Sequence, residues 1–431
     1  MEKKTEQQSR KRRNRSHVGI DRLSSLPDRV LRHILSFLPT KSSVRTSILG
    51  QRWRHLWAYV PNLDFDNENQ ETINRVMLLR KVQTLHTFLL YHKINCSPYQ
   101  LDTWVTFAIL RNVQKLHLYF RYQTALPRCL FTCETLVNLT LDSCGVVPSS
   151  GAVRLPRLKT LHLSFVQFEA DESLPHLISG CPVLEELVME FLLDMVHCCI
   201  SSPTIKFLVF NLVADGRKRV ELNTPALGFL EMSDSFSDHI ESGALNSLFG
   251  ADIELHNFDK KRDDVLHSQT VLEFVGRLCN VKRLKLHLAY DISIVDSLLS
   301  AWTVSFRNLT ELKLVADYRF LLKMLENADN LQVLTFSEYS NEIERAAEPP
   351  QQVPTCLLSR LKMVEFGCIA GHAYELEVIR YILRYSKVLE RVKIVYGLCI
   401  GSEEKINMLQ EISLFRRGST TCEVAFVRYA V

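Results

Sequence analysis

A six-residue motif, apolar-x-x-apolar-x-apolar, recurs along this 431-residue chain and constrains its fold more than any other feature. Within each copy, apolar and polar positions alternate, which is the pattern of a short strand with one buried face. The copies are VQKLHL at 113–118, LVNLTL at 136–141, LKTLHL at 158–163, LEELVM at 184–189, IKFLVF at 205–210, LGFLEM at 227–232, VKRLKL at 281–286, LTELKL at 309–314, LQVLTF at 331–336, LKMVEF at 361–366 and LERVKI at 389–394. The chain is therefore expected to stack many similar strands.

The spacing of the copies predicts the architecture. Between the fourth positions of the first six copies the steps are 23, 22, 26, 21 and 22 residues, and later steps are longer. Repeats of about 20–29 residues stack into a solenoid, in which each repeat adds one parallel strand. The expected fold class is therefore α/β, an irregular solenoid whose parallel β-strands bury alternate side chains in one continuous core.

The intervening positions of each strand are expected to face the concave surface of the solenoid. In the central repeats these positions place an apolar patch beside acidic residues. We identify the patch, on Val188, Phe207, Val209 and Phe229, as a possible target-binding site. Two alternatives stay open, since irregular repeats could shift the register or a loop could cover the strands.

The stretch from residue 23 to 60 has the pattern of three short helices. Ser25, Pro27 and Asp28 form a helix start, in which Ser25 can cap the helix and Asp28 opposes the positive end of its dipole. Apolar residues then recur at helical spacing: Leu31, Ile34, Leu35 and Leu38 before Pro39, Val44 and Ile48 after a Thr40 cap, and Trp53, Leu56 and Trp57 after Gly50. A module this small buries only a small core, so some of these side chains are expected to face a partner.

This stretch closely resembles the F-box of plant F-box proteins. The resemblance rests on LPD at 26–28, ILSFLPTK at 34–41, RTSIL at 45–49 and RWRHLW at 52–57. It implies docking on an SKP-family adaptor, which joins the module to a cullin and a RING subunit in an SCF ubiquitin ligase. Six residues become candidates for the adaptor face or the small core beneath it: Leu26, Pro27, Leu31, Ile34, Leu35 and Leu38. Gly50 and Gln51 stand where the pattern usually has Ser-Lys, a change expected to loosen the turn without abolishing docking.

Two further regions resemble parts of the same family. The repeats resemble the irregular leucine-rich repeats of plant F-box proteins, and the chain from Pro354 onward resembles their FBD domain. There the sequence predicts a strand at 362–366, a turn through Gly371, an amphipathic helix with Leu376, Ile379 and Leu383, a strand at 392–395, and a last helix and strand. This α/β domain is expected to close the open end of the solenoid.

These segments divide the chain into a disordered basic tail at 1–19, an F-box at 20–66, a helical cap with leucine-rich repeats at 67–345, and an FBD domain at 346–431. The polar, acidic residues 62–69 predict a linker, and the acidic stretch 341–352 predicts a boundary loop. A helix is expected at 71–90. An amphipathic turn follows it, with Leu101, Trp104, Val105 and Ala108 on one face. Both helices are expected to cover the first layer of the array.

The net charge is concentrated in the tail. The whole chain carries +4, and residues 1–15 contribute +5, which leaves about −1 for the remainder. Arg10, Lys11, Arg12, Arg13 and Arg15 form a possible nuclear-import signal, with a solubilising tail as the alternative. Specific nucleic-acid binding is not expected, because no aromatic and basic surface follows. With no signal-peptide or membrane-span pattern, we expect a location in the nucleus, the cytoplasm or both, and no membrane partner.

The cysteines and motifs argue against an enzyme. The twelve cysteines are scattered, many in apolar runs, and lack zinc-site spacing, so we expect reduced core cysteines, no metal and no cofactor. No hydrolase, phosphate-binding or metalloprotease motif is present. Cys368 and His372 have the chemistry of a nucleophile and a base, but no orienting group accompanies them.

We therefore expect a non-catalytic substrate-recognition subunit of an SCF ubiquitin ligase. It would dock on the adaptor through the F-box and present an unknown target protein on the repeats for ubiquitination. The alternatives are an interaction scaffold outside any ligase and a ligand-dependent sensor with a pocket on the repeats.

Overall fold

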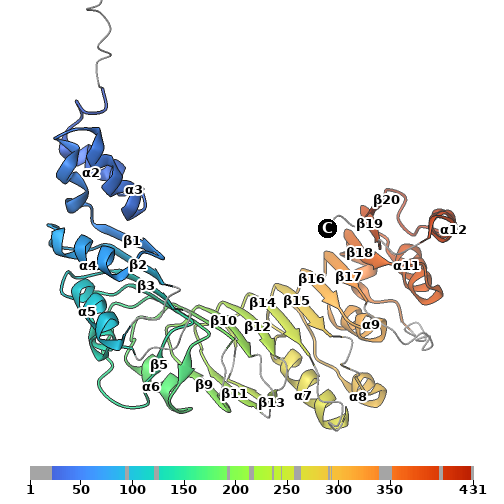
Figure 1. Cartoon of the computed structure of the whole chain (residues 1–431). Helices are drawn as coiled ribbons and strands as arrows, with labels where there is room; N and C mark the ends of the chain where they lie inside the picture. Colours follow the sequence, from blue (N-terminus) through green and yellow to red (C-terminus); the bar gives the residue numbers. More distant parts are fainter. Residues whose placement is uncertain are drawn as a thin grey trace, which may run out of the picture.

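The computed structural model describes residues 22–92, 97–120, 126–191, 195–212, 218–234, 237–243, 245–256, 264–289, 292, 294–338, 352–397 and 401–428. These residues form one curved array, in which a parallel sheet lines the inner side of an arc and helices line the outer side (Figure 1). Short helices extend the arc beyond its first strand, and further helices lie at its C-terminal end. The expected solenoid is confirmed.

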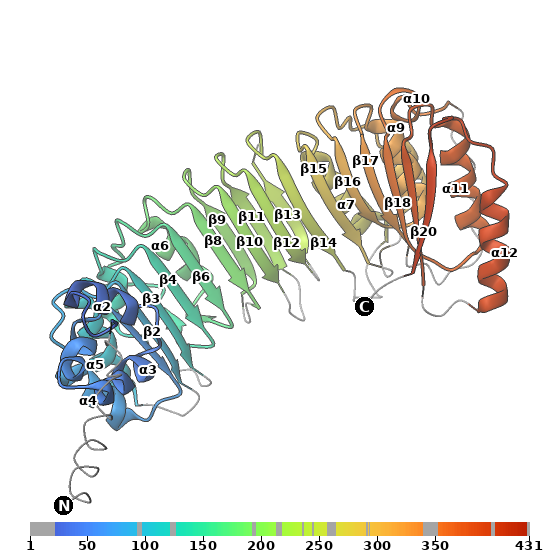
Figure 2. The same ribbon diagram turned by 90° about the horizontal axis from the view of Figure 1, so that it is seen from above.

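The inner sheet has fifteen strands, and every neighbouring pair is parallel. Their order in the sheet follows the chain, because each repeat returns along the outer side before the next strand is added (Figure 2). The strands are β1 (Asn62–Asp66), β2 (Thr87–His92), β3 (Lys115–Phe120), β4 (Asn138–Asp142), β6 (Thr160–Ser164), β8 (Glu186–Glu190), β10 (Phe207–Leu212), β12 (Phe229–Asp234), β14 (Gly250–Leu255), β15 (Arg283–Leu288), β16 (Glu311–Val315), β17 (Val333–Ser337), β18 (Met363–Ile369), β19 (Arg391–Tyr396) and β20 (Glu423–Arg428).

The return segments on the outer side are helical at both ends of the array and extended in its centre. The helices are α4 (Gln70–Leu79), α5 (Pro98–Ile109), the 3-10 helix η3 (Arg128–Thr132), α6 (Ser173–Ser179), α7 (Asp264–Arg277), α8 (Asp296–Ala301), α9 (Tyr318–Asn327), α10 (Thr355–Ser359), α11 (Ala373–Tyr385) and α12 (Ser402–Ser413). In the centre, β9 (His197–Ser201), β11 (Lys218–Asn223) and β13 (Ser237–Ser242) form a second parallel sheet, and β5 (Val146–Val147) pairs with β7 (Gln167–Phe168).

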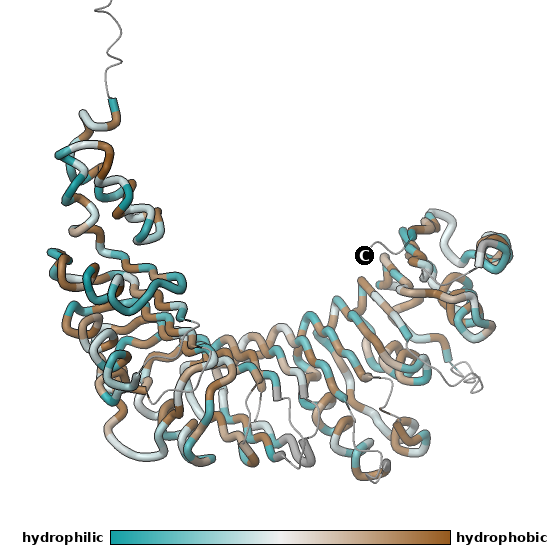
Figure 3. The backbone as a smooth tube through the Cα atoms, in the orientation of Figure 1, coloured by the Kyte–Doolittle hydropathy of each residue, from teal (hydrophilic) through white to brown (hydrophobic). Residues whose placement is uncertain are grey.

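Side chains along the inner strands alternate between the core and the concave face, and those on the inward side form the core. On β10, Leu208 and Phe210 are fully buried, whereas Phe207 on the opposite face is 36% exposed. The alternation is visible as bands of apolar and polar residues along the strands (Figure 3). Each fully buried leucine or phenylalanine stabilises the fold by roughly 2 kcal/mol relative to an exposed one. The predicted register is confirmed, since the concave positions pair directly from β3 to β12.

The sheet begins earlier in the chain than the sequence predicted. Residues 62–66, expected in a linker, form β1, and the helix expected at 71–90 ends at Leu79, before β2. Helices α4 and α5 are therefore the return segments of the first two repeats rather than a separate cap. The predicted apolar face of α5 is confirmed, because its four apolar residues are fully buried.

Three strands that were not predicted from the sequence, β1, β2 and β14, also carry the repeat motif. It reads VPNLDF at 60–65, LHTFLL at 85–90 and LFGADI at 248–253. In the first, aspartates at concave positions made the segment look like a polar loop, and in the third, Ala251 takes the place of a larger apolar residue. The motif is defined by its buried positions, so concave residues carry no information about it.

The C-terminal region continues the same sheet. Strand β17 pairs with β18 in parallel, so β18, β19 and β20 add three strands to the inner sheet. The predicted strands, the turn and the helices are confirmed. Gly371 adopts φ of 92°, a conformation that favours glycine, and the predicted apolar residues of α11 are buried. The predicted boundary loop at 341–352 lies outside the described residues except for its last position.

Candidate functional site

The F-box-like module contains one small core. Its elements are α2 (Asp28–Leu35), α3 (Thr40–Arg45) and the 3-10 helices η1 (Thr46–Leu49) and η2 (Trp53–Tyr59). The core consists of Leu31, Leu35, Trp53, Leu56 and Val60, and Leu26 packs against it. The three predicted helical segments are present, and the third, whose apolar face is buried, has 3-10 geometry.

Arg52 fixes the start of α2. Its guanidinium donates hydrogen bonds to the backbone carbonyls of Ser24 and Leu26 and contacts Asp28 Oδ1 through Nε at 3.0 Å and Nη2 at 2.8 Å. These charge-assisted bonds hold the chain that enters the helix against the segment before η2. Sequence reasoning missed this role, because Arg52 and its partners are more than twenty residues apart.

Ser25 and Thr40 were predicted to cap helices, but their side chains form other hydrogen bonds. The Ser25 hydroxyl donates to a backbone carbonyl three residues earlier, and Pro27 occupies the N-cap position of α2 without a side-chain cap. Thr40 is the first residue of α3, is 4% exposed, and accepts a hydrogen bond on Oγ1 from the Asp64 backbone N–H at 2.8 Å. Thr40 thus ties the module to strand β1.

The structure divides the six candidate adaptor residues into two groups. Leu31 and Leu35 are 0% and 1% exposed, so of the two roles expected for them, adaptor face or small core, they take the core. Leu26 is partly buried against the same core. The exposed members are Pro27, Ile34 and Leu38.

More apolar side chains are exposed here than the sequence predicted. Phe37 is 75% exposed, Ile48 is 88% exposed and Leu49 is 60% exposed. Val30, Ile34 and Phe37 recur at helical spacing along α2 and its C-terminal turn, so an exposed apolar face lies beside the buried one. Large apolar groups left in solvent on a small module indicate a contact surface for another protein.

Gly50 and Gln51 depart from the F-box pattern, yet the backbone does not require glycine. Gly50 has φ of 162°, an extended conformation open to any residue, and a Cβ there would lie 4.0 Å from Trp53 Cδ1. We expect Gly50→Ser with Gln51→Lys to leave the melting temperature within about 2 °C of wild type and adaptor capture unchanged. Thermal melts and a pull-down measure both quantities. A shift of several degrees or a lost pull-down would contradict this expectation.

The module is fixed to the first repeat by Arg80. This residue follows α4, is 7% exposed, and donates hydrogen bonds to the backbone carbonyls of Trp57, Val60 at 2.9 Å and Asn62 at 2.8 Å. Its guanidinium also lies 5.7 Å from the centroid of the Trp57 ring. Burial lowers the pKa of Arg80 to about 10, so the group stays charged at neutral pH. One buried cation thereby connects the last helix of the module to β1.

The concave patch in the central repeats is only partly exposed. The Phe207 and Phe229 rings stack across β10 and β12, with centroids 5.1 Å apart and planes inclined by 7°. Val188 lies opposite Val209 on the neighbouring strand and is half-buried. Val209 is only 8% exposed, so little of its side chain is available for a contact, and its role as a target-binding residue stays a prediction.

A second aromatic pair lies at the other end of the strands. Phe165 and Phe191 follow β6 and β8 directly, and their rings stack with centroids 4.5 Å apart. Both residues have positive φ, 51° and 53°, which is rare for a bulky side chain. They are 44% and 37% exposed, and sequence reasoning missed them because no periodicity extends past the strand. Asn67 and Ser143, which directly follow β1 and β4, have the same positive φ, so this conformation belongs to the turn that ends these strands. The exposed, stacked rings themselves make the pair a candidate contact site.

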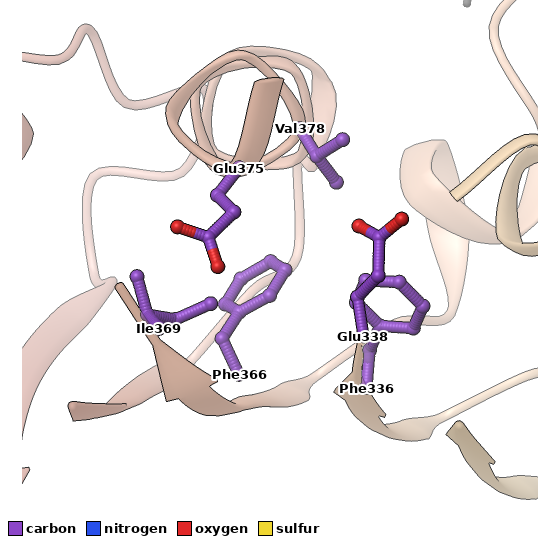
Figure 4. Close-up of a pocket in the computed structure, with 6 residues that line it drawn as sticks. All are labelled: Phe336, Glu338, Phe366, Ile369, Glu375 and Val378. Carbon is purple, nitrogen blue, oxygen red and sulfur yellow. The ribbon is translucent and has the colours of Figure 1, made fainter. Parts of the chain in front are cut away.

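A small pocket lies where the last repeat meets the C-terminal region (Figure 4). It is lined by Phe336, Glu338, Phe366, Ile369, Glu375 and Val378. The Glu375 carboxylate accepts hydrogen bonds from three backbone N–H groups at the start of α11, at 2.7–3.3 Å. Glu338, by contrast, accepts one backbone hydrogen bond, from Tyr318. Burial, with the charges of Asp317 and Glu375, raises the pKa of Glu338 to about 7, although Arg319 opposes the shift.

Glu338 makes stability depend on pH. Its pKa in the folded chain, about 7, exceeds its ordinary value of 4.5, so folding takes up a proton between these values and stability falls as pH rises through them. We expect Glu338→Gln to raise the melting temperature by a few degrees at pH 8 and to change it little at pH 4.5. Thermal melts of both proteins across this range measure the effect. The same pH dependence in both proteins would refute this role.

The remaining features predicted from the sequence add no further candidate site among the described residues. Between residues 352 and 397, no hydrogen bond joins Cys368 to His372, and the His372 ring stacks on Tyr374 at 5.5 Å. The predicted nuclear-import cluster at 10–15 lies outside the described residues. Within the described part of the chain, no helix combines the length and apolar character needed to cross a membrane, and no three His, Cys, Asp or Glu side chains converge as metal ligands.

Family models match three parts of the chain. The F-box domain matches residues 23–65, the model described as FBD-associated F-box protein At5g56370, LRR repeats, matches residues 101–246, and FBD matches residues 348–394. The first match covers the helical module and most of β1, the second covers β3 through β13, and the third covers β18 and most of β19. The F-box is a domain that generally binds SKP-type adaptors.

Relatives in Arabidopsis thaliana cover nearly the whole chain. The F-box/FBD/LRR-repeat protein At5g56420 is 31% identical over 434 residues, which are 94% of this chain and 99% of the relative. The F-box/LRR-repeat protein At4g14096 is 30% identical over 452 residues, covering 94% of this chain and 95% of the relative. The F-box/LRR-repeat protein At4g14103 is 34% identical over 354 residues, covering 73% and 91%. The chain therefore belongs to the plant F-box/FBD/LRR-repeat protein family.

Proposed function

We propose that this protein is the substrate-recognition subunit of an SCF ubiquitin ligase. The observation that carries the proposal is the exposed apolar face of the F-box, where Phe37, Ile48 and Leu49 stand in solvent although the module has a core of its own. Such a face is suited to an SKP-family adaptor, which would in turn bring a cullin and a RING subunit.

The remainder of the chain supports the second half of this role. The repeats present a concave face with an exposed aromatic ring at Phe207, more than a hundred residues from the F-box in sequence. A target bound there would be held by one rigid array whose other end binds the adaptor. Catalysis would come from the bound ligase subunits, and this chain would contribute proximity, which raises the effective concentration of the acceptor lysine.

Co-purification tests the proposal. The full chain is expressed with an SKP-family adaptor and a cullin, and retention of both partners on the tagged chain is measured by quantitative immunoblotting. The expected result is retention of the adaptor at near-stoichiometric amounts and retention of the cullin only when the adaptor is present. A folded chain that retains neither would exclude the ligase function.

A further inference from the structure

We propose that the concave face between β8 and β14 binds a segment of the target that carries an arginine beside apolar residues. This inference deepens the proposed function, on which it rests, by naming the chemistry of the substrate. It is carried by three features of the sheet: a stacked aromatic pair, carboxylates without fixed cations, and a change in charge at the next strand.

The aromatic pair supplies a platform on an unpartnered sheet face. The Phe207 and Phe229 rings are nearly parallel, so each covers one face of the other. On the far side of Phe229, the register position on β14 is Gly250, where a Cβ would lie 3.1 Å from Phe229 Cδ2. Because Gly250 has no Cβ, β14 places no side chain on the second face of the Phe229 ring, which packs close to the glycine backbone. A planar cation can stack on such a face.

Carboxylates surround the platform. The concave positions of β8, β12 and β14 hold Glu186, Glu190, Glu231, Asp252 and Glu254. Strands β8, β10, β12 and β14 are all described, and none of their concave positions carries a lysine or an arginine. The chain outside its basic tail has almost no net charge, so this enrichment is local rather than a reflection of composition.

Some of these carboxylates are neutralised within the protein and others are not. Asp252 pairs with Lys285 at 2.8 Å, so its charge is balanced, and Glu254 meets the imidazoles of His256 at 3.3 Å and His287 at 2.9 Å. Glu190 accepts only a hydroxyl, from Ser164 at 3.1 Å, and Glu186 meets the imidazole of His162 at 3.1 Å. Glu231 forms no hydrogen bond or ion pair with the residues that the structure describes.

The unbalanced carboxylates flank the aromatic platform. Glu186 lies in register with Phe207, and Glu231 follows Phe229 by two positions on the same face of β12. A ring face with a carboxylate at its edge suits a guanidinium, which can stack on the ring while it donates two parallel hydrogen bonds. Lysine would satisfy the charge but not the stacking, so arginine is preferred.

The charge pattern also indicates where on the sheet the target segment would bind. At the concave positions of β15 and β16 the sign changes, with Arg283, Lys285 and Lys313 against one acid, Glu311. A basic segment would be repelled there and is confined to β8 through β14. At the other end of β8, the exposed ring of Phe191 follows Glu190 directly and offers a contact for an apolar residue that flanks the arginine.

Peptide selection on the full chain, purified with its adaptor, tests the inference. The probe is a displayed library of random 12-residue peptides, selected against wild type, Glu186→Lys with Glu231→Lys, Phe207→Ala with Phe229→Ala, and the matched control Glu311→Lys. We expect wild type and the control to enrich arginine at least about twofold over the naive library, next to apolar residues. The charge-reversed variant should instead enrich Asp and Glu, and the alanine variant should lose arginine enrichment.

A synthetic fluorescent copy of the best wild-type peptide gives the quantitative readout. By fluorescence anisotropy, replacement of its arginine with citrulline should weaken binding at least about tenfold, and Glu231→Lys should do the same to the unmodified peptide. No arginine enrichment, or the same peptides from wild type and the charge-reversed variant, would overturn the inference. Retention of the adaptor in the same preparations reports separately on the ligase function, so the two failures are distinguishable.

Discussion

Ile34→Asp with Phe37→Asp is expected to abolish capture of an SKP-family adaptor, with at least a roughly hundredfold loss of affinity. Both side chains lie on the exposed face of α2 and its C-terminal turn, 38% and 75% exposed. Two carboxylates there would have to be desolvated against an apolar partner surface, which is costly because nothing would pair with them. Because neither residue belongs to the core, the fold should persist. Adaptor affinity is measured by biolayer interferometry on the purified full chain.

The control is Leu266→Asp, which places one such carboxylate at a 57% exposed leucine near the start of α7. It should bind the adaptor like wild type. Alanine at Leu26 would be a poorer test, since this side chain also packs on the module's core. If the Ile34 and Phe37 double variant is folded and still binds the adaptor, this face of α2 is not the docking surface.

Arg80→Met is expected to produce the largest loss of stability among single substitutions at the junction. Methionine retains part of the apolar stem but removes the guanidinium donors of three backbone carbonyls, of which that of Trp57 keeps the Val60 N–H at 3.2 Å. The loss should cost roughly 3 kcal/mol. The cost should fall on the junction, because the carbonyls belong to η2, the residue after it and β1. We therefore expect hydrogen exchange of the amides between residues 53 and 66 to accelerate by about a hundredfold or more.

Two further variants serve as comparisons for Arg80→Met. Arg80→Lys keeps the charge but cannot reach three carbonyls at once, so partial protection should return. Arg111→Met removes a guanidinium that lies over the Phe107 ring at 3.6 Å and donates to one backbone carbonyl, and it should change exchange little. Unchanged exchange at residues 53–66 in Arg80→Met would show that the junction does not depend on this cation.

The repeat architecture could be predicted because its signal is periodic. Each strand needs two apolar positions separated by one residue, and the core imposes this wherever the repeat occurs. The strands that were missed were not recognised because of their residue composition. Asp64 and Asp66 make β1 look like a polar linker, although both occupy positions of the strand that do not face the core.

The site was harder to predict than the fold, and the reason is geometric. Helical spacing shows that Leu31 and Leu35 share a face and that Val30 and Ile34 share another, but both faces are apolar. Which face turns inward depends on the placement of η2, and that is a tertiary contact. The roles of Arg52 and Arg80 were invisible for the same reason, since each acts on backbone groups distant in sequence.

Because the sheet is continuous from β1 to β20, the number of strands sets the distance between the F-box and any site on the repeats. Neighbouring strands lie about 4.8 Å apart, so the six steps from β1 to β10 amount to roughly 29 Å along the sheet. Inserting or deleting one repeat before β10 would move a bound target by about one strand spacing and rotate it by roughly 20°. In the proposed ligase, the number of repeats would then select which lysines of the same target come within reach of the conjugating enzyme.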